Sequence, residues 1–258
     1  MEIISINPIN TSTQLSVQSN TALAAYLYNR DPLFQYVSTG YNNDATTTSI
    51  VISFASTQTI DRIAMVNHNL KSFTMFYNGA TANTFALTTT ADTTVSNYTS
   101  NSSTSQYWRT TQVFATSVTL DLKSTIVANA EKAIGYFYVG NLTLDFARDP
   151  DAASYKPLID PKQVKHELSD GGIRIHQIAN KQTAQIKYKY ITETFRNSLK
   201  TIYDSYTPFV FAPFGTTTSW DGIFFEAVWP GTFDFFRYSD DAPSSGFSGT
   251  INLEETPV

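Results

Sequence analysis

The sequence predicts a mainly β protein made of two β-sandwich domains, the second of which also carries one α-helix. Apolar and polar residues alternate along several segments, most clearly at Ala184, Ile186, Tyr188 and Tyr190, as in a strand with one buried face. Only the segment after Thr192 has convincing helical spacing of its apolar residues. With 258 residues, 41% of them hydrophobic, the chain is long enough for two apolar cores.

A change in charge density near residue 147 divides the chain. Residues 1–146 contain 6 Lys or Arg and 8 Asp or Glu, whereas the remaining 112 residues contain 11 and 14. The segment 147–161 contains three prolines and little periodicity, as expected of a linker. The sequence therefore predicts a first domain over 1–146, a linker over 147–161 and a second domain over 162–258.

The first domain contains several short runs with strand character. Ser49–Phe54 and Ile60–Val66 are rich in β-branched residues and are predicted to be neighbouring strands, separated by the polar residues 55–59. Residues 118–123 and 134–146 continue the strand pattern. The Thr/Ser/Asn-rich stretch 88–106 has too few apolar residues to form a core, which predicts a surface loop or a solvent-facing hairpin.

The second domain is predicted to contain a hairpin, a helix and four further strands. Gly172–Ile178 is expected to pair with the alternating strand 183–190 through a turn over 179–182. Thr192 is suited to cap a helix that ends before Pro208. The remaining predicted strands are Phe209–Pro213, Asp221–Trp229, Thr232–Tyr238 and Gly246–Leu253.

Composition excludes several classes of function. The net charge of −5 and the pI of 5.1 provide no broad positive field for phosphates, so we expect neither nucleic acid nor an anionic membrane as a partner. The chain has no cysteine, which excludes disulfides and thiolate chemistry. No segment approaches the roughly 18 apolar residues of a membrane span, and the first residues do not resemble a signal peptide.

Catalytic motifs are also missing from the sequence. There is no HExxH motif, no GxSxG elbow and no glycine-rich phosphate loop. Asp221 and Glu226 are the best carboxylate pair for glycoside hydrolysis, but spacing alone is weak support, so we expect a non-enzymatic protein. No cofactor is predicted apart from a possible structural calcium ion at oxygen-rich loops such as Asn42–Asp44.

Aromatic residues are abundant, with 18 Phe, 15 Tyr and 3 Trp. The segment 233–238 places rings on both faces of its predicted strand, so at least one face should contact the helix, the other domain or another chain. The predicted interface residues are Phe224, Trp229, Phe233, Phe235, Phe236 and Tyr238.

Two segments of the first domain carry a resemblance to a known family. Ile60-Asp-Arg-Ile-Ala-Met-Val-Asn-His-Asn-Leu70 and Ile134-Gly-Tyr-Phe-Tyr-Val-Gly140 resemble a central and a closing strand of discoidin-like, or galactose-binding-like, jelly-roll domains of phage tail and virion proteins. The resemblance implies that Asn67, His68 and Asn69 form a structural turn. It carries over no sugar-binding residues, and Tyr136 replaces an acidic residue usual in that family.

The second domain, which ends in Ser245-Gly-Phe-Ser-Gly-Thr-Ile-Asn-Leu-Glu-Glu-Thr-Pro257, resembles distal and minor tail proteins in outline. This resemblance implies a structural component of a bacteriophage tail tip or baseplate, made in the host cytoplasm and located in the virion tail. Its expected partners are further copies of itself in a ring-like homo-oligomer and other tail proteins. The alternative is a carbohydrate- or host-receptor-binding module of a virion, with a host surface glycan as ligand.

Overall fold

The computed structural model describes residues 1–29, 34–79, 105–146, 155–167, 173–213, 225–237 and 246–256. The protein is mainly β and is built from β-sandwich sheets, as the sequence predicts. Two compact units are present, the first formed mainly by Glu2–Thr143 and the second by Leu144–Phe211 with Phe224–Pro257. Within the described ranges, no helix has the length and apolar character needed to cross a membrane.

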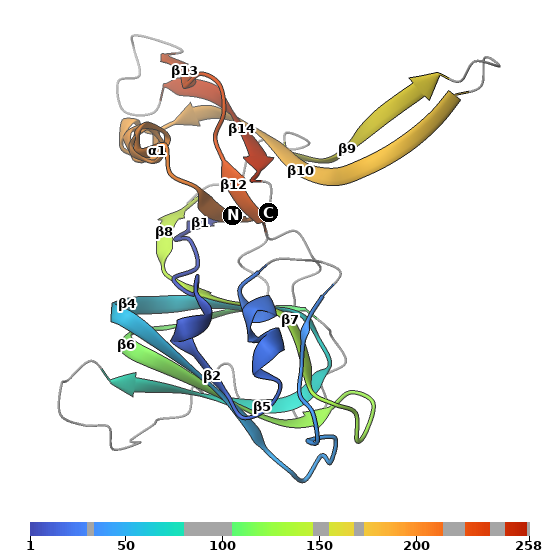
Figure 1. Ribbon diagram of the computed structural model, residues 1–258. Helices are drawn as coiled ribbons and strands as arrows, with labels where there is room; N and C mark the ends of the chain where they lie inside the picture. The colour runs from blue at the N-terminus through green and yellow to red at the C-terminus, as the bar shows by residue number, and fades with distance from the viewer. Residues whose placement is uncertain are drawn as a thin grey trace. The chain divides into compact units, whose positions relative to one another are not determined.

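The first unit is organised around one twisted sheet (Figure 1). Its strands follow the order β3-β7-β4-β6-β5, and β2 also pairs with β4. The elements are β1 (Glu2–Ile4), η1 (Ser12–Gln14), β2 (Leu15–Val17), η2 (Thr21–Leu27), β3 (Tyr36–Val37), β4 (Thr48–His68), β5 (Leu70–Gly79), β6 (Gln106–Thr125), β7 (Ala133–Gly140) and β8 (Leu142–Asp145).

Strand β4 is one continuous strand, so the prediction of two strands at Ser49–Phe54 and Ile60–Val66 was wrong. Both halves pair with β6, and the register shifts between Ser53 and Gln58. The first half has β2 as its other neighbour, whereas the second half has β7. The polar residues 55–59 mark this change of neighbour and register, which explains why the local pattern resembles a turn.

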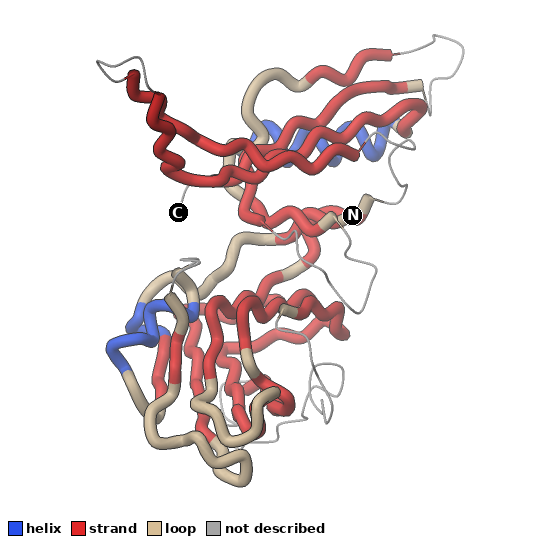
Figure 2. The backbone as a smooth tube through the Cα atoms, turned by 90° about the vertical axis from the view of Figure 1, so that its right-hand side faces the viewer, coloured by secondary structure: helices blue, strands red, loops and turns tan. Residues whose placement is uncertain are grey.

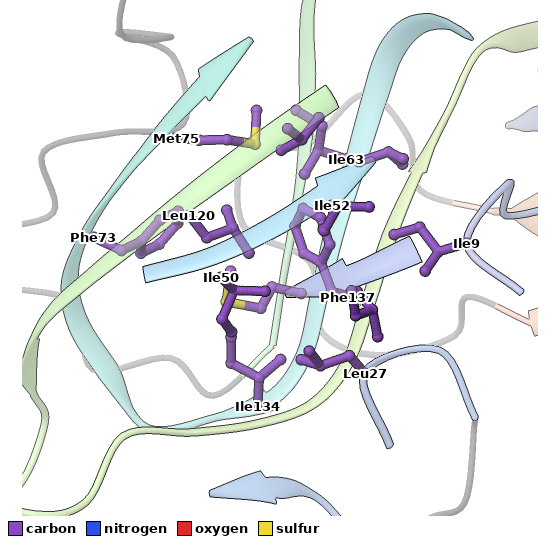
Figure 3. Close-up of a cluster of buried hydrophobic side chains, with 14 of the residues drawn as sticks. Ile9, Leu27, Ile50, Ile52, Ile63, Phe73, Met75, Leu120, Ile134 and Phe137 are labelled. Atoms are coloured by element: carbon purple, nitrogen blue, oxygen red, sulfur yellow. The ribbon is translucent and has the colours of Figure 1, made fainter. Parts of the chain in front are cut away.

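The core of the first unit is formed by apolar side chains from both halves of β4 and from the strands around it. In Figure 3 these side chains point toward one another from β4, β5, β6 and β7, and Ile9 and Leu27 join them from the N-terminal segments. Ile50, Ile52 and Ile63 are each fully buried. Burial of such side chains stabilises the fold by about 1.5–3 kcal/mol each.

The second unit consists of a sheet with one helix against a face of it (Figure 2). The sheet has the order β8-β1-β11-β12-β14-β10-β9, so β1 and β8 also belong to it, and β13 pairs with β14. The elements are β9 (Tyr155–Glu167), β10 (Ile173–Ile191), α1 (Glu193–Ser205), β11 (Phe209–Ala212), β12 (Phe225–Val228), β13 (Asp234–Arg237) and β14 (Phe247–Glu255).

Helix α1 begins where the sequence predicts. The Thr192 side-chain oxygen accepts a hydrogen bond from the Phe195 backbone N–H at 3.2 Å, which satisfies one of the unpaired donors of the first turn. Leu199 is fully buried, and the Phe195 ring packs edge-on against Tyr188 at 5.7 Å. The helix ends at Ser205, because Tyr206 adopts a left-handed conformation with φ 51°.

Two predictions about the second domain were wrong. Strand β10 runs unbroken from Ile173 to Ile191, so residues 179–182 are strand and not a turn. Its hairpin partner is β9, which includes residues 155–161 of the predicted linker. Prolines are tolerated in β9 because it is the outermost strand of its sheet.

Candidate interaction surface

The β9–β10 hairpin extends well beyond the sheet to which it belongs (Figure 1). The two strands pair from Tyr155 opposite Ile186 to Glu167 opposite Ile173. Strand β14 accompanies β10 only from Thr183 onward. The distal half of the hairpin is therefore a two-stranded ribbon. An isolated ribbon of this kind is only marginally stable in water, so further contacts would stabilise it.

Apolar side chains are exposed along the hairpin. Leu158, Ile173 and Ile175 are 57%, 55% and 54% exposed, and Val164 is 38% exposed. Ile173 and Ile175 lie opposite Glu167 and Lys165, on one face, whereas Val164 lies on the other. Both faces of the ribbon thus offer apolar area to a partner, which is typical of an interaction surface.

Sequence reasoning missed this hairpin because the proline-rich segment that forms β9 was assigned to a linker. A signal for it exists in the sequence. Asp170-Gly171 is a turn dipeptide, and it is flanked by Val164 and by the alternating residues Ile173 and Ile175.

Three of the predicted interface aromatics form a cluster beside helix α1. Trp229 and Phe233 are 5.6 Å apart, Phe233 and Phe235 are 5.1 Å apart, and Tyr203 of α1 contacts both Trp229 and Phe233. The Arg196 guanidinium lies 5.5 Å from the centre of the Phe233 ring. The rings thus hold the helix to the sheet within the second unit.

The predicted interface residues differ in exposure. Phe235 is buried, so its ring packs inside the unit and not on its surface. Phe236, the next residue of β13, is 57% exposed and points to the opposite face of the strand. Phe224 and Tyr238 lie outside the described residues.

Asn67 and His68 are the last two residues of β4, and Asn69 links them to β5. Asn67 has a left-handed backbone with φ 52°. Asn69 donates from its side chain to the Glu131 carbonyl at 2.7 Å and accepts from the Ala133 backbone at 2.8 Å. These side chains fix the path of the chain between two strands.

His68 is buried, and its Nδ1 atom accepts a hydrogen bond from the Leu70 backbone N–H at 3.1 Å. Burial lowers the pKa of His68 to about 4, because the charged imidazolium loses its hydration. A hydrogen bond with Gln106 acts in the opposite direction. The imidazole is therefore neutral at physiological pH, which suits a structural residue.

The oxygen-rich loop at Asn42–Asp44 lies beside a buried lysine. The Lys132 ammonium donates to the carbonyl oxygens of Tyr41 and Asn43, the latter at 3.4 Å. A carboxylate oxygen of Asp44 accepts hydrogen bonds from both the backbone and the hydroxyl of Thr125. The Asn43 carbonyl and one carboxylate oxygen of Asp44 are thus already engaged by protein donors.

Burial lowers the pKa of Lys132, although the charges of Asp44 and Glu131 oppose this effect. Glu131 in turn accepts hydrogen bonds from the Ser38 hydroxyl at 2.8 Å and the Gly40 backbone at 3.0 Å. Lys132 therefore supplies the positive charge at the centre of a group of backbone and carboxylate oxygens.

A buried ionic cluster at the start of the chain was not predicted. Glu2 accepts hydrogen bonds from Arg62 at 2.7 and 3.1 Å and from the Tyr107 hydroxyl at 2.6 Å, and it pairs with Arg109 at 2.5 Å. No local pattern marks this cluster, because its members are far apart in the sequence. Glu2 is fully buried and its charge is balanced by Arg62 and Arg109, so we interpret the cluster as structural.

An exposed aromatic pair lies near helix η2 in the first unit. The rings of Tyr26 and Phe34 are stacked, with centres 5.2 Å apart and an interplanar angle of 12°. Phe34 is 51% exposed, so one ring of the pair is accessible to solvent. A flat exposed ring is the type of surface on which a sugar can stack.

Groups that could hold a metal ion are not gathered in the described part of the chain. Within it, no group of three His, Asp or Glu residues is close enough to hold a metal ion. His166 and His176 lie on the two strands of the hairpin, where His166 is opposite Arg174 and His176 is opposite Val164. Glu226 is in β12, whereas Asp221 lies outside the described residues.

Neither known family models nor curated proteins match this sequence. Among solved structures, a carbohydrate-binding module, CpGH89CBM32-6 of Clostridium perfringens, is similar with a TM-score of 0.40 and 14% identity, over 52% of this chain and 97% of that module. Chitosan-binding module 1 of a Paenibacillus sp. IK-5 chitosanase/glucanase is similar with a TM-score of 0.43 and 13% identity, over 53% and 99%.

A third similar structure is CpGH89CBM32-5 of Clostridium perfringens, solved with GalNAc-β-1,3-galactose. Its TM-score is 0.39 and its identity 11%, over 52% of this chain and 99% of that module. The structures named here are carbohydrate-binding modules and not tail proteins. Similarities at these TM-scores and identities do not assign a ligand to this chain.

Proposed function

We propose that this chain is a non-enzymatic structural protein that assembles with other protein chains through the distal half of its β9–β10 hairpin. The observation that carries the proposal is the exposure of Ile173 and Ile175, each more than half accessible, on a ribbon that projects past its own sheet. Burying one such side chain contributes about 1.5–3 kcal/mol. A partner that covers both faces of the ribbon would gain several such contributions.

The setting proposed for this assembly is a bacteriophage tail tip, with copies of the chain in a ring and other tail proteins as neighbours. This setting rests on the sequence resemblance described above. A ring repeats one modest interface around an axis and needs no catalytic step. In the first unit the buried Glu2 carboxylate is paired with Arg62 and Arg109 of the same chain, which is consistent with a structural role.

The proposal is tested by making the hairpin polar. In the double variant Ile173→Asp/Ile175→Asp, we expect the protein to fold but to lose its association with copies and with the tail-tube protein of the same virion, measured by mass photometry and negative-stain microscopy. Val127→Asp is the matched control, because Val127 is 73% exposed in the first unit. Unchanged association in the double variant would contradict a role of the hairpin.

The second candidate function is binding of a host surface glycan by the first unit. The stacked pair Tyr26 and Phe34 favours it, because an accessible ring supported from behind is suited to stacking on a sugar. On a glycan array, Phe34→Ala should abolish binding. Phe114→Ala, which removes another exposed ring of the same unit, should leave it unchanged. Absence of any bound glycan for the native protein would exclude this candidate.

A further inference from the structure

The two edges of the β9–β10 ribbon differ chemically. Strand β9 has prolines at 157 and 161, opposite Ala184 and Asn180. Proline has no N–H to donate, and residues separated by an even number of positions direct their backbone groups to the same side of a strand. Since pairing with β10 continues through both prolines, their nitrogens face the outer edge. The outer edge of β9 is therefore depleted of donors, as in edges protected against strand addition.

Strand β10 has no proline, and its other edge is open over Ile173–Lys181. Within the described part of the chain, β14 begins to pair with β10 at Thr183, and β9 is the partner of the preceding residues. At the junction, the Gln182 backbone N–H donates to the Glu255 carboxylate at 2.8 Å. The outward N–H of Gln182 is thus satisfied by the end of β14. Among the described residues, no strand pairs with the same edge of β10 along Ile173–Lys181.

The direction of individual N–H groups follows from this bond. Gln182 donates toward β14, and it lies opposite Ile159, which is two residues from each proline of β9. Beyond the bulge between Gln177 and Ala179, Lys165 lies opposite Ile175. As at Gln182 and Ile159, the two residues of this pair do not bond to each other. The N–H groups of Ile175 and Lys165 therefore point outward, to the β10 edge and the β9 edge respectively.

We infer that a strand from a second copy of this chain adds to the β10 edge along Ile173–Lys181, in line with the end of β14. This inference rests on the proposed assembly function and names its partner and its binding mode. The added strand would pair with backbone groups, and the exposed side chains of Ile173 and Ile175 would give it apolar contacts.

Charge favours a second copy as the occupant. The hairpin, residues 155–191, contains 7 Lys or Arg and 3 Asp or Glu, a net charge of +4. The rest of the chain contains 10 and 19, a net charge of −9. The hairpin of one copy is thus attracted to the remainder of another, and this attraction should weaken as salt screens it.

The test places one proline at the same level of the ribbon on each edge. Ile175→Pro removes an outward N–H from the β10 edge, and Lys165→Pro removes one from the β9 edge, neither breaking a bond between the two strands. Self-association of the full-length protein is measured by sedimentation equilibrium at low and high salt. Far-UV circular dichroism and the melting temperature verify that each variant is folded.

We expect Ile175→Pro to weaken self-association by at least about tenfold, since it combines a lost inter-chain hydrogen bond with a steric clash. Lys165→Pro should change it less than about twofold. An equal loss in both variants, or a loss in Lys165→Pro alone, would overturn the choice of edge. If the native protein is monomeric at high concentration yet still binds the tail-tube protein through Ile173 and Ile175, the second copy is excluded while the proposed function stands.

Discussion

Glu2 and Arg62 form a buried bidentate ion pair across sixty residues of sequence. The two carboxylate oxygens of Glu2 accept hydrogen bonds from Arg62 at 2.7 and 3.1 Å, and Glu2 is fully inaccessible to solvent. The bond connects strand β1 to the middle of the first unit's longest strand, β4. Because charges removed from water must be paired, this pair is sensitive to the loss of either member.

The substitution Glu2→Gln should destabilise the first unit by about 3–5 kcal/mol, because it removes the buried bidentate partner of Arg62 and leaves that charge only the longer pair with Asp61 at 3.4 Å. The free energy of unfolding is measured by urea denaturation. Asp204→Asn is the control, since it breaks an exposed pair with Lys200 that should contribute less than about 1 kcal/mol. Equal effects of the two substitutions would contradict a buried, tightly coupled Glu2.

Stability should fall on acidification in a way that depends on His68. Its pKa is about 4 in the folded protein and about 6.5 in an unfolded chain. The unfolded state therefore takes up a proton first as the pH drops, so the stabilisation by neutral His68 is complete above pH 6.5 and is lost between pH 6.5 and about 4. A tenfold difference in proton affinity equals about 1.4 kcal/mol, so the loss approaches about 3 kcal/mol.

This dependence is measured as the free energy of unfolding from pH 7.5 to 4. His68→Gln should be less stable at neutral pH but should lose less stability over the interval. Glu2 adds a further loss at lower pH. Burial alone would raise the pKa of its carboxyl, but bonds from Arg62 and Tyr107 outweigh burial and lower it. Identical pH profiles for the native protein and His68→Gln would refute a buried neutral imidazole.

The substitution Lys132→Met should destabilise the first unit by about 2–3 kcal/mol, because the carbonyls of Tyr41 and Asn43 lose a charged donor. Lys200→Met, at an exposed position on α1, should change stability by less than about 1 kcal/mol. Both are compared by thermal unfolding. A similar loss in the two variants would show that the buried ammonium has no special role.

Calcium should not stabilise the native protein, since Lys132 and Thr125 already engage the oxygens near Asp44. The melting temperature is therefore expected to be the same in excess calcium chloride and in EDTA. A clear rise with calcium alone would demonstrate a metal site that these protein donors do not fill.

Gly249→Ala should destabilise the second unit by about 1–3 kcal/mol through overpacking. A Cβ atom at position 249 would lie 2.5 Å from the Phe235 ring and closer still to the Asp234 carbonyl. Gly231→Ala is compared with it, because a Cβ there meets no atom within 4 Å and only the positive φ of 91° opposes it. Stability is read from the melting of near-UV circular dichroism, and a neutral Gly249→Ala would show that β13 is free to move away from β14.

Strand character and the start of the helix were accessible from the sequence because each depends on neighbouring residues. The alternation at Ala184, Ile186 and Tyr188 appears in the structure as buried positions of β10, and Thr192 caps α1. Such local rules do not specify which strand pairs with which. The local pattern therefore predicted two strands where β4 is one, and a linker where half of β9 lies.

The sequence by itself determined that the chain is mainly β, that a helix follows Thr192, and that the chain has neither cysteines nor a recognisable catalytic motif. Only the tertiary structure decided that Glu2 pairs with Arg62, that Lys132 is buried among loop oxygens, and that β9 and β10 form a projecting ribbon. The physical reason is the distance along the chain over which each interaction acts. Periodicity and capping act over a few residues, whereas strand partners and buried ion pairs arise from contacts between segments that only folding brings together.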